Sequence, residues 1–64
     1  MTLEDSVRAN CHAFYEDLED FDDAMNSVED VVVDVLGEHP NADEQEVKQL
    51  IIAEFKELFD EDSD

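Results

Sequence analysis

The stretch FYEDLEDFDDAM, residues 14–25, decides the fold of this chain, because its apolar side chains set the length of the first helix. They continue a spacing of three or four residues that begins near the N-terminus. The positions in this series are Leu3, Val7, Cys11, Phe14, Leu18, Phe21 and Met25. We therefore predict one long amphipathic helix over residues 3–25, with Thr2 as its N-cap.

A second helix is predicted over residues 28–36. The segment NSVED, residues 26–30, offers a cap followed by acids in the first turn. The apolar side chains that follow have helical spacing, at Val28, Val31, Val32, Val35 and Leu36. The β-branched run VVVDVL also suits a strand. The spacing, the cap and Gly37 as the residue after the helix favour a helix instead.

A third helix is predicted over residues 42–60, after a break at Pro40, which biases His39 away from helical backbone. Its apolar positions are Val47, Leu50, Ile51, Phe55 and Leu58. Together the three segments predict an all-α fold, a small three-helix bundle. Residues 1–64 are expected to form a single domain, with residues 61–64 as a frayed tail. A chain this short is near the lower limit for a core that is stable alone.

Charge restricts the function of the chain. It carries 21 Asp and Glu against three Lys and Arg, a net charge of −18. Between Arg8 and Lys48 no Lys or Arg occurs over 39 residues, which contain 13 acids. This argues against direct binding to nucleic acid or an anionic membrane, and favours partners with basic surfaces. The lone Cys11 and the lack of a long apolar run predict a cytoplasmic location.

The acids of the opening stretch are the main candidate site for binding a partner. On the predicted helix Glu16, Glu19, Asp20 and Asp23 lie opposite the apolar stripe, and Asp17 and Asp22 flank this side. Three further acids extend this surface along the second helix, at Glu29, Asp30 and Asp34. Residues 16–23 would span about 12 Å of helix, which gives about one charge per 2 Å. Duplex DNA carries one charge per roughly 1.7 Å of its axis, so the acids match a phosphate backbone in line density.

In overall character the chain resembles small acidic phage inhibitors that mimic DNA, and it is most similar to the anti-CRISPR proteins among them. The likeness lies in short length, extreme acidity and clusters such as YEDLEDFDD, residues 15–23. These families share no sequence signature, so no family residue is carried over. The resemblance implies a non-enzymatic inhibitor that blocks the basic DNA-binding groove of a target such as a CRISPR-Cas effector. It would act in the cytoplasm of the host cell.

Two other interpretations stay open. In one, the acidity is an adaptation of a halophile protein to high salt, and such a protein should unfold when salt is removed. In the other, the chain is an acidic adaptor that docks through its third helix, with Ile52 and Phe59 as anchors. These two side chains project to one side of the main apolar face of that helix. They either widen the surface that faces the core or contact a second copy in a homodimer.

We expect neither catalysis nor a bound metal or cofactor. Carboxylates on exposed helix faces lack the partly buried setting that raises the pKa of a general acid. An EF-hand loop beginning at Asp17 lacks the required glycine and one oxygen ligand. His12 lies four residues before Glu16, a spacing compatible with metal binding that fits a surface histidine better. Cys11 lies on the apolar stripe, which predicts a buried side chain rather than a reactive thiol.

Overall fold

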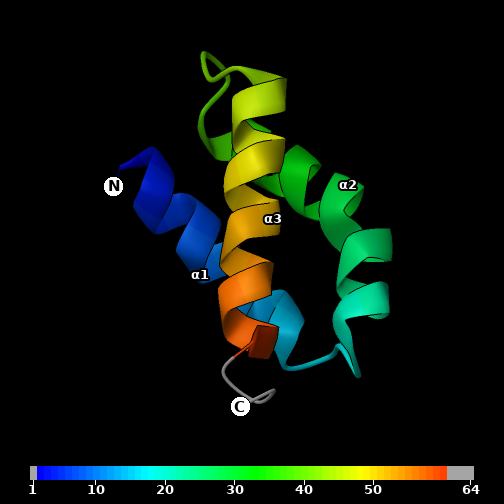
Figure 1. The fold of residues 1–64 in the computed structure, drawn as a ribbon. Coiled ribbons are helices and arrows are strands. Elements are labelled where there is room, and N and C mark those ends of the chain that lie inside the picture. The colour runs from blue at the N-terminus through cyan, green and yellow to red at the C-terminus, as the bar shows by residue number, and fades with distance from the viewer. Residues whose placement is uncertain (1, 61–64) are drawn as a thin grey trace.

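Three helices make up the described part of the chain, residues 2–60 of a computed structural model (Figure 1). They are α1 (Leu3–Tyr15), α2 (Phe21–Glu38) and α3 (Glu44–Asp60). Each helix packs against the other two. The α1–α2 connection and the α2–α3 connection lie at opposite ends of α3 (Figure 1). The all-α three-helix bundle is confirmed, and the predicted frayed tail lies outside the described residues.

The core is built largely from one face of α2. Half of the buried apolar side chains come from this helix, at Ala24, Val28, Val31, Val32 and Val35. The others are Val7, Cys11, Val47, Ile51 and Phe55. The run VVVDVL is therefore helical, as predicted, because Val31 and Val35 lie on the buried side while Val33 is 68% exposed. A strand would instead have put these three residues, which are two apart, on the same face.

The prediction of one helix over residues 3–25 is wrong, because α1 ends at Tyr15 and residues 16–20 form a turn. Leu18 lies in this turn and still packs against the core, so the apolar spacing continues across a break in the helix. A continuous helix would have set Glu16 near Asp20 and Glu19 near Asp23, and such like-charge pairs are destabilising. The break replaces this helical spacing with a turn, in which the Glu19 N–H donates to Asp23 Oδ2 at 3.4 Å. It also moves three of the acids to the start of α2, where the helix dipole favours negative charge.

The predicted second helix was too short at both ends, since α2 covers Phe21–Glu38 rather than residues 28–36. The segment NSVED lies inside α2, and the cap is Asp20 instead. Gly37 is also inside the helix and has no positive φ, so it does not act as a left-handed end residue. The helix ends because His39 precedes Pro40 and leaves the helical region, with φ −130° and ψ 72°.

The third helix begins two residues later than predicted, at Glu44 rather than residue 42. Asp43 caps it: its Oδ1 accepts a hydrogen bond from the Gln45 backbone N–H at 3.0 Å. At the start of α1 the predicted cap is confirmed, since Thr2 Oγ1 accepts from the Asp5 N–H at 3.1 Å. Each helix thus begins at a side chain that accepts a hydrogen bond from the first turn.

Candidate acidic interface

The acidic turn, defined as residues 16–23, places the predicted acids around the end of the bundle where α1 meets α2. Its carboxylates are all exposed, at Glu16, Asp17, Glu19, Asp20, Asp22 and Asp23. They do not form the straight helical row that the sequence predicted. Four lie in the connection and two in the first turn of α2, so the array bends around a corner of the molecule. The line density calculated for a single helix therefore no longer applies.

Two of these carboxylates hold the turn together. Asp20 Oδ1 accepts a hydrogen bond from the Asp23 N–H at 3.0 Å, which caps α2. Asp23 Oδ2 in turn accepts from the Glu19 N–H at 3.4 Å. The backbone carbonyls of Phe14 and Tyr15 accept hydrogen bonds from the N–H groups of Asp17 and Leu18, three residues on, and these bonds tighten the end of α1. Asp20 and Asp23 thus have a structural role in the turn, whereas the sequence predicted partner binding alone for them.

Aromatic packing anchors both ends of the acidic turn on α3. Tyr15, the last residue of α1, meets the ring of Phe59 edge to face, with ring centroids 5.0 Å apart. Phe21, the first residue of α2, approaches the same ring with centroids 6.1 Å apart and planes at 72°. Such edge-to-face pairs stabilise beyond the area they bury. The segment between Tyr15 and Phe21, which carries four of the exposed carboxylates, is therefore held against α3 at both of its ends.

The other three predicted acids lie along α2 and are all exposed, at Glu29, Asp30 and Asp34. By helical periodicity Asp30 and Asp34 project outward, whereas Glu29 borders the groove between α2 and α3. The structure therefore does not bring all nine acids onto one surface. Both the acidic turn and the outer side of α2 nevertheless lack Lys and Arg, because both belong to the segment between Arg8 and Lys48.

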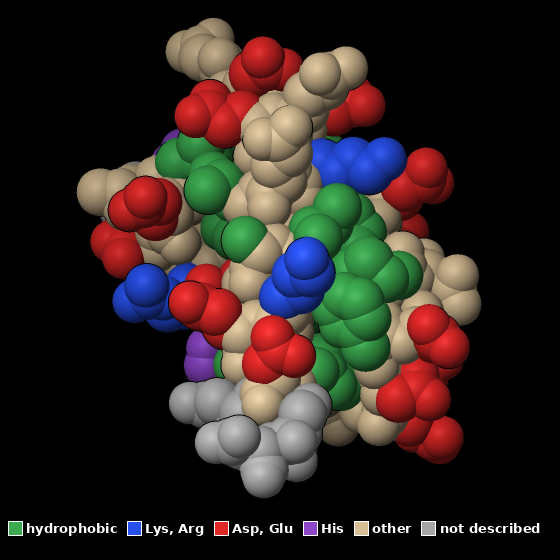
Figure 2. All heavy atoms as spheres, in the orientation of Figure 1, with side chains coloured by type: hydrophobic (Ala, Val, Ile, Leu, Met, Phe, Trp, Pro, Cys, Tyr) green, Lys and Arg blue, Asp and Glu red, His purple; other side chains and the backbone are tan. Residues whose placement is uncertain are grey.

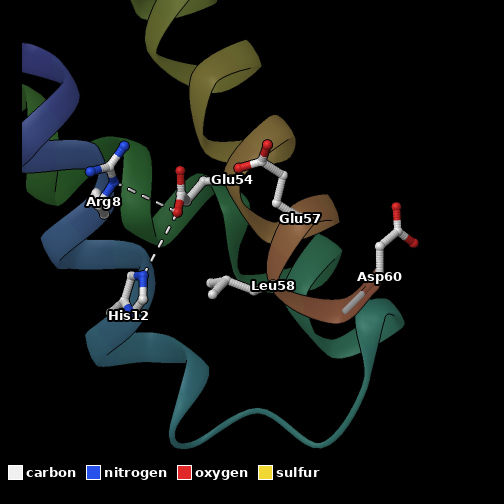
Figure 3. A pocket seen from close by; sticks show the side chains of 6 residues that line it. All are labelled: Arg8, His12, Glu54, Glu57, Leu58 and Asp60. Atoms are coloured by element: carbon white, nitrogen blue, oxygen red, sulfur yellow. Dashed lines mark ion pairs between the residues drawn. The ribbon is translucent and has the colours of Figure 1, made fainter. Parts of the chain in front are cut away.

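The cations lie on α1 and α3, and one of them takes part in a cluster that the sequence did not predict (Figure 3). Glu54 Oε2 of α3 lies 4.0 Å from Arg8 Nε and 3.7 Å from His12 Nε2, both on α1. Glu57, Leu58 and Asp60 complete the lining of an open hollow of about 590 Å³. We call this region the α1–α3 seam. Glu4 lies one turn before Arg8, at a spacing that favours an ion pair within α1, and only the packing of α1 on α3 shows that Arg8 lies beside Glu54.

Cys11 lies behind this seam and is fully buried, as predicted. Its Sγ is 3.9 Å from the Ile51 carbonyl oxygen, the acceptor for a weak S–H hydrogen bond. Burial, and to a lesser extent the negative charge of Glu54, raises the pKa of the Cys11 thiol from 9.0 to about 12. The thiolate is the reactive form, so the chemistry of this cysteine is suppressed near neutral pH.

The described residues contain no group of three or more His, Cys, Asp or Glu side chains arranged to hold a metal ion. None of the helices within residues 2–60 is long and apolar enough to cross a membrane. The predicted anchors of α3 are both half-buried: Ile52 packs at the edge of the core, and Phe59 packs under the acidic turn. Comparison of the chain with protein-family models, curated proteins and solved structures gives no match.

Proposed function

We propose that this protein is a non-enzymatic inhibitor that occupies the basic, nucleic-acid-binding surface of another protein. The observation that carries the proposal is the anchored acidic turn. Four of its six exposed carboxylates lie between Tyr15 and Phe21, whose rings both pack on Phe59, and the other two directly follow Phe21. An array that is ordered before binding loses less conformational entropy when it meets a partner. Its charge would speed association with a basic groove and suppress binding to acidic surfaces.

The distribution of cations supports the same function. The acidic turn and the outer side of α2 belong to the segment without Lys or Arg, whereas Arg8, Lys48 and Lys56 lie on α1 and α3. The turn itself would therefore present carboxylates, and no Lys or Arg, to a partner. A CRISPR-Cas effector is the first target class to test, since its duplex channel and its PAM-reading site are basic. The inhibitor would then act in the cytoplasm of the cell that contains this target.

Competition with DNA tests the proposal. The chain is immobilised, bound proteins are recovered from a bacterial lysate, and the column is washed with duplex DNA or with salt of equal ionic strength. We expect a nucleic-acid-binding protein that DNA displaces more effectively than salt. Its binding should be lost in the variant Glu16→Lys, Asp17→Lys, Glu19→Lys, which changes carboxylates whose oxygens make no hydrogen bond within residues 2–60.

The matched control reverses three exposed acids away from the acidic turn, Glu4→Lys, Glu46→Lys and Glu57→Lys, and changes the net charge equally. It should retain most of the binding, because the proposal depends on the turn and not on total charge. Equal loss in both variants would show that charge alone directs binding. Retention in both would place the interface elsewhere.

Salt adaptation is tested separately by unfolding the protein in urea as the ionic strength is lowered. The caps and aromatic contacts of the acidic turn do not require bound cations, so we expect the chain to remain helical by circular dichroism in dilute buffer. Self-repulsion at a net charge of −18 should lower the free energy of unfolding gradually. Unfolding in dilute buffer at neutral pH would instead favour adaptation to high salt.

A further inference from the structure

The groove between α2 and α3 exposes apolar surface that the acidic turn does not use. At one end it is a hollow of about 230 Å³ lined by Glu29, Val32, Val33, Leu36, Glu44 and Lys48. Val33 is 68% exposed, and no other large apolar side chain within residues 2–60 is as exposed to solvent. Half-buried Met25 and Ile52 continue this surface by helical periodicity. Figure 2 shows hydrophobic side chains gathered beside α3 on the side where Figure 1 places α2.

The two edges of the groove differ in charge, since the α3 edge carries two lysines, with Glu44 one turn before Lys48, whereas the α2 edge carries acids and no Lys or Arg. On α3, Lys48 and Lys56 lie four residues before and after Ile52, and Lys or Arg side chains border the apolar surface in Figure 2. They are two of the three Lys and Arg residues of the chain, and neither forms an ion pair within the described residues. On α2, helical periodicity places Asp22 and Glu29 along the facing edge.

The spacing of the two charged edges also matches. Asp22 and Glu29 are seven residues apart, or about 10.5 Å along α2, and Lys48 and Lys56 are eight residues apart, or about 12 Å along α3. The order matches as well, since Glu29 and Lys48 line the same end of the groove. At the other end, next to Asp22, the Phe21–Phe59 contact joins the two helices.

We propose that the α2–α3 face binds a second copy of the chain, related by a two-fold axis that runs along the groove. This rotation sets the acidic edge of one copy against the lysine edge of the other, without shifting either along the axis. Glu29 then faces Lys48 of the other copy, Asp22 faces its Lys56, and Val33 is covered. A two-fold axis across the groove would instead pair acids with acids and lysines with lysines, which is unfavourable.

A second copy fits this face better than a basic peptide or helix would. A basic segment suits the edge formed by Asp22 and Glu29, but it would meet Lys48 and Lys56 on the opposite edge. An interface of standard size covers about 800 Å² per partner, roughly a fifth of the 4475 Å² that one chain exposes. Of the acidic turn only Asp22 takes part in this contact, and the other five carboxylates lie at the same end of both copies and outside it, so the dimer does not depend on the proposed inhibitory function.

Sedimentation equilibrium of the full chain alone, from micromolar to millimolar concentration, tests the proposal. The mass should rise from 7.3 kDa toward twice that value. Val33→Asp should keep the lower mass throughout while its helical circular dichroism is unchanged, because this side chain is already exposed. Ala9→Asp, which adds the same charge at an exposed position of α1, should behave like the wild type. A wild-type chain that stays monomeric, or a Val33→Asp chain that still dimerises, would overturn the proposal.

Charge reversal distinguishes contact between copies from contact within one chain. Glu29→Lys alone and Lys48→Glu alone should each raise the dimer dissociation constant about tenfold or more, because each sets like charges opposite one another twice. An equimolar mixture of the two variants restores both pairs and should form a heterodimer about as tightly as the wild type. A mixture no heavier than its separate components would contradict the arrangement.

Discussion

The acidic turn and the α1–α3 seam both concentrate carboxylates, yet they accommodate them by different means. In the seam, Glu54 is the common partner of Arg8 and His12, and its side chain is only 18% exposed. In the turn, the backbone N–H groups of Asp23 and Glu19 donate to carboxylates, while every acid remains exposed. The carboxylate of Glu54 is thus paired where α1 and α3 pack together. In the turn, negative charge is ordered but left exposed to solvent.

The largest effect should come from the buried thiol behind the seam. Because the pKa of Cys11 rises from 9.0 to about 12 on folding, the unfolded chain loses this proton first as the pH increases. Cys11 therefore adds stability below about pH 9, and this contribution declines as the pH rises toward 12. The loss amounts to about 1.4 kcal/mol per pH unit for one proton.

Urea unfolding of the wild type and of Cys11→Ala on either side of pH 9 measures this difference. The wild type should lose more stability than Cys11→Ala over the alkaline range, because lysines and other titrating groups are common to both. Parallel curves would show that the thiol titrates normally in the folded chain, and that the seam does not bury it as described.

The next effect concerns the aromatic base of the acidic turn. Phe59→Ala should lower the free energy of unfolding by about 2 kcal/mol, less than for a fully buried Phe, because the ring is half-buried. It removes the edge-to-face contacts with Tyr15 and Phe21. Amide hydrogen exchange should also accelerate over residues 16–20 more than within the α1–α3 seam. Uniform acceleration along the chain would mean that Phe59 supports the whole bundle and not the turn in particular.

The smallest expected effect distinguishes the acids whose carboxylates hold the turn from those that are only exposed on it. Asp20→Ala should cost about 1 kcal/mol, because the Asp23 N–H loses its acceptor at the start of α2. Asp17→Ala is the matched control in the same turn. It removes an equal charge, from a carboxylate that accepts no hydrogen bond among the described residues. It should be neutral or slightly stabilising. Chemical denaturation of the two variants at one ionic strength compares them, and equal costs would contradict the assigned cap.

Most of the architecture could be predicted from the sequence because it depends on local signals. The spacing of valines identified the buried face of α2, and Pro40 marked the second connection. The first connection was missed because Leu18 packs on the core from within a turn and mimics the next step of a helical stripe. A signal was present all the same: Asp20 with Asp23 three residues later resembles a capping box.

The site was only partly predictable, for a different reason. That the nine acids would be exposed follows from their number and from the shortage of cations. Their division between a turn and a helix depends on where α1 stops, and the choice of Glu54 as the partner of Arg8 and His12 depends on the packing of α1 against α3. Contacts between segments more than 40 residues apart leave no periodic trace in the sequence.

The anchoring of the acidic turn also bears on how this protein can change over evolutionary time. Mutations at Tyr15, Asp20 or Phe21 alter the support of the loop, so purifying selection should act on them whatever the partner. Glu16, Asp17 and Glu19 use no side-chain oxygen to hold the fold, so they can diversify at little cost in stability. Under the proposed function, a scaffold divided in this way could adapt to a changing target by exchanging three residues while its architecture stays constant.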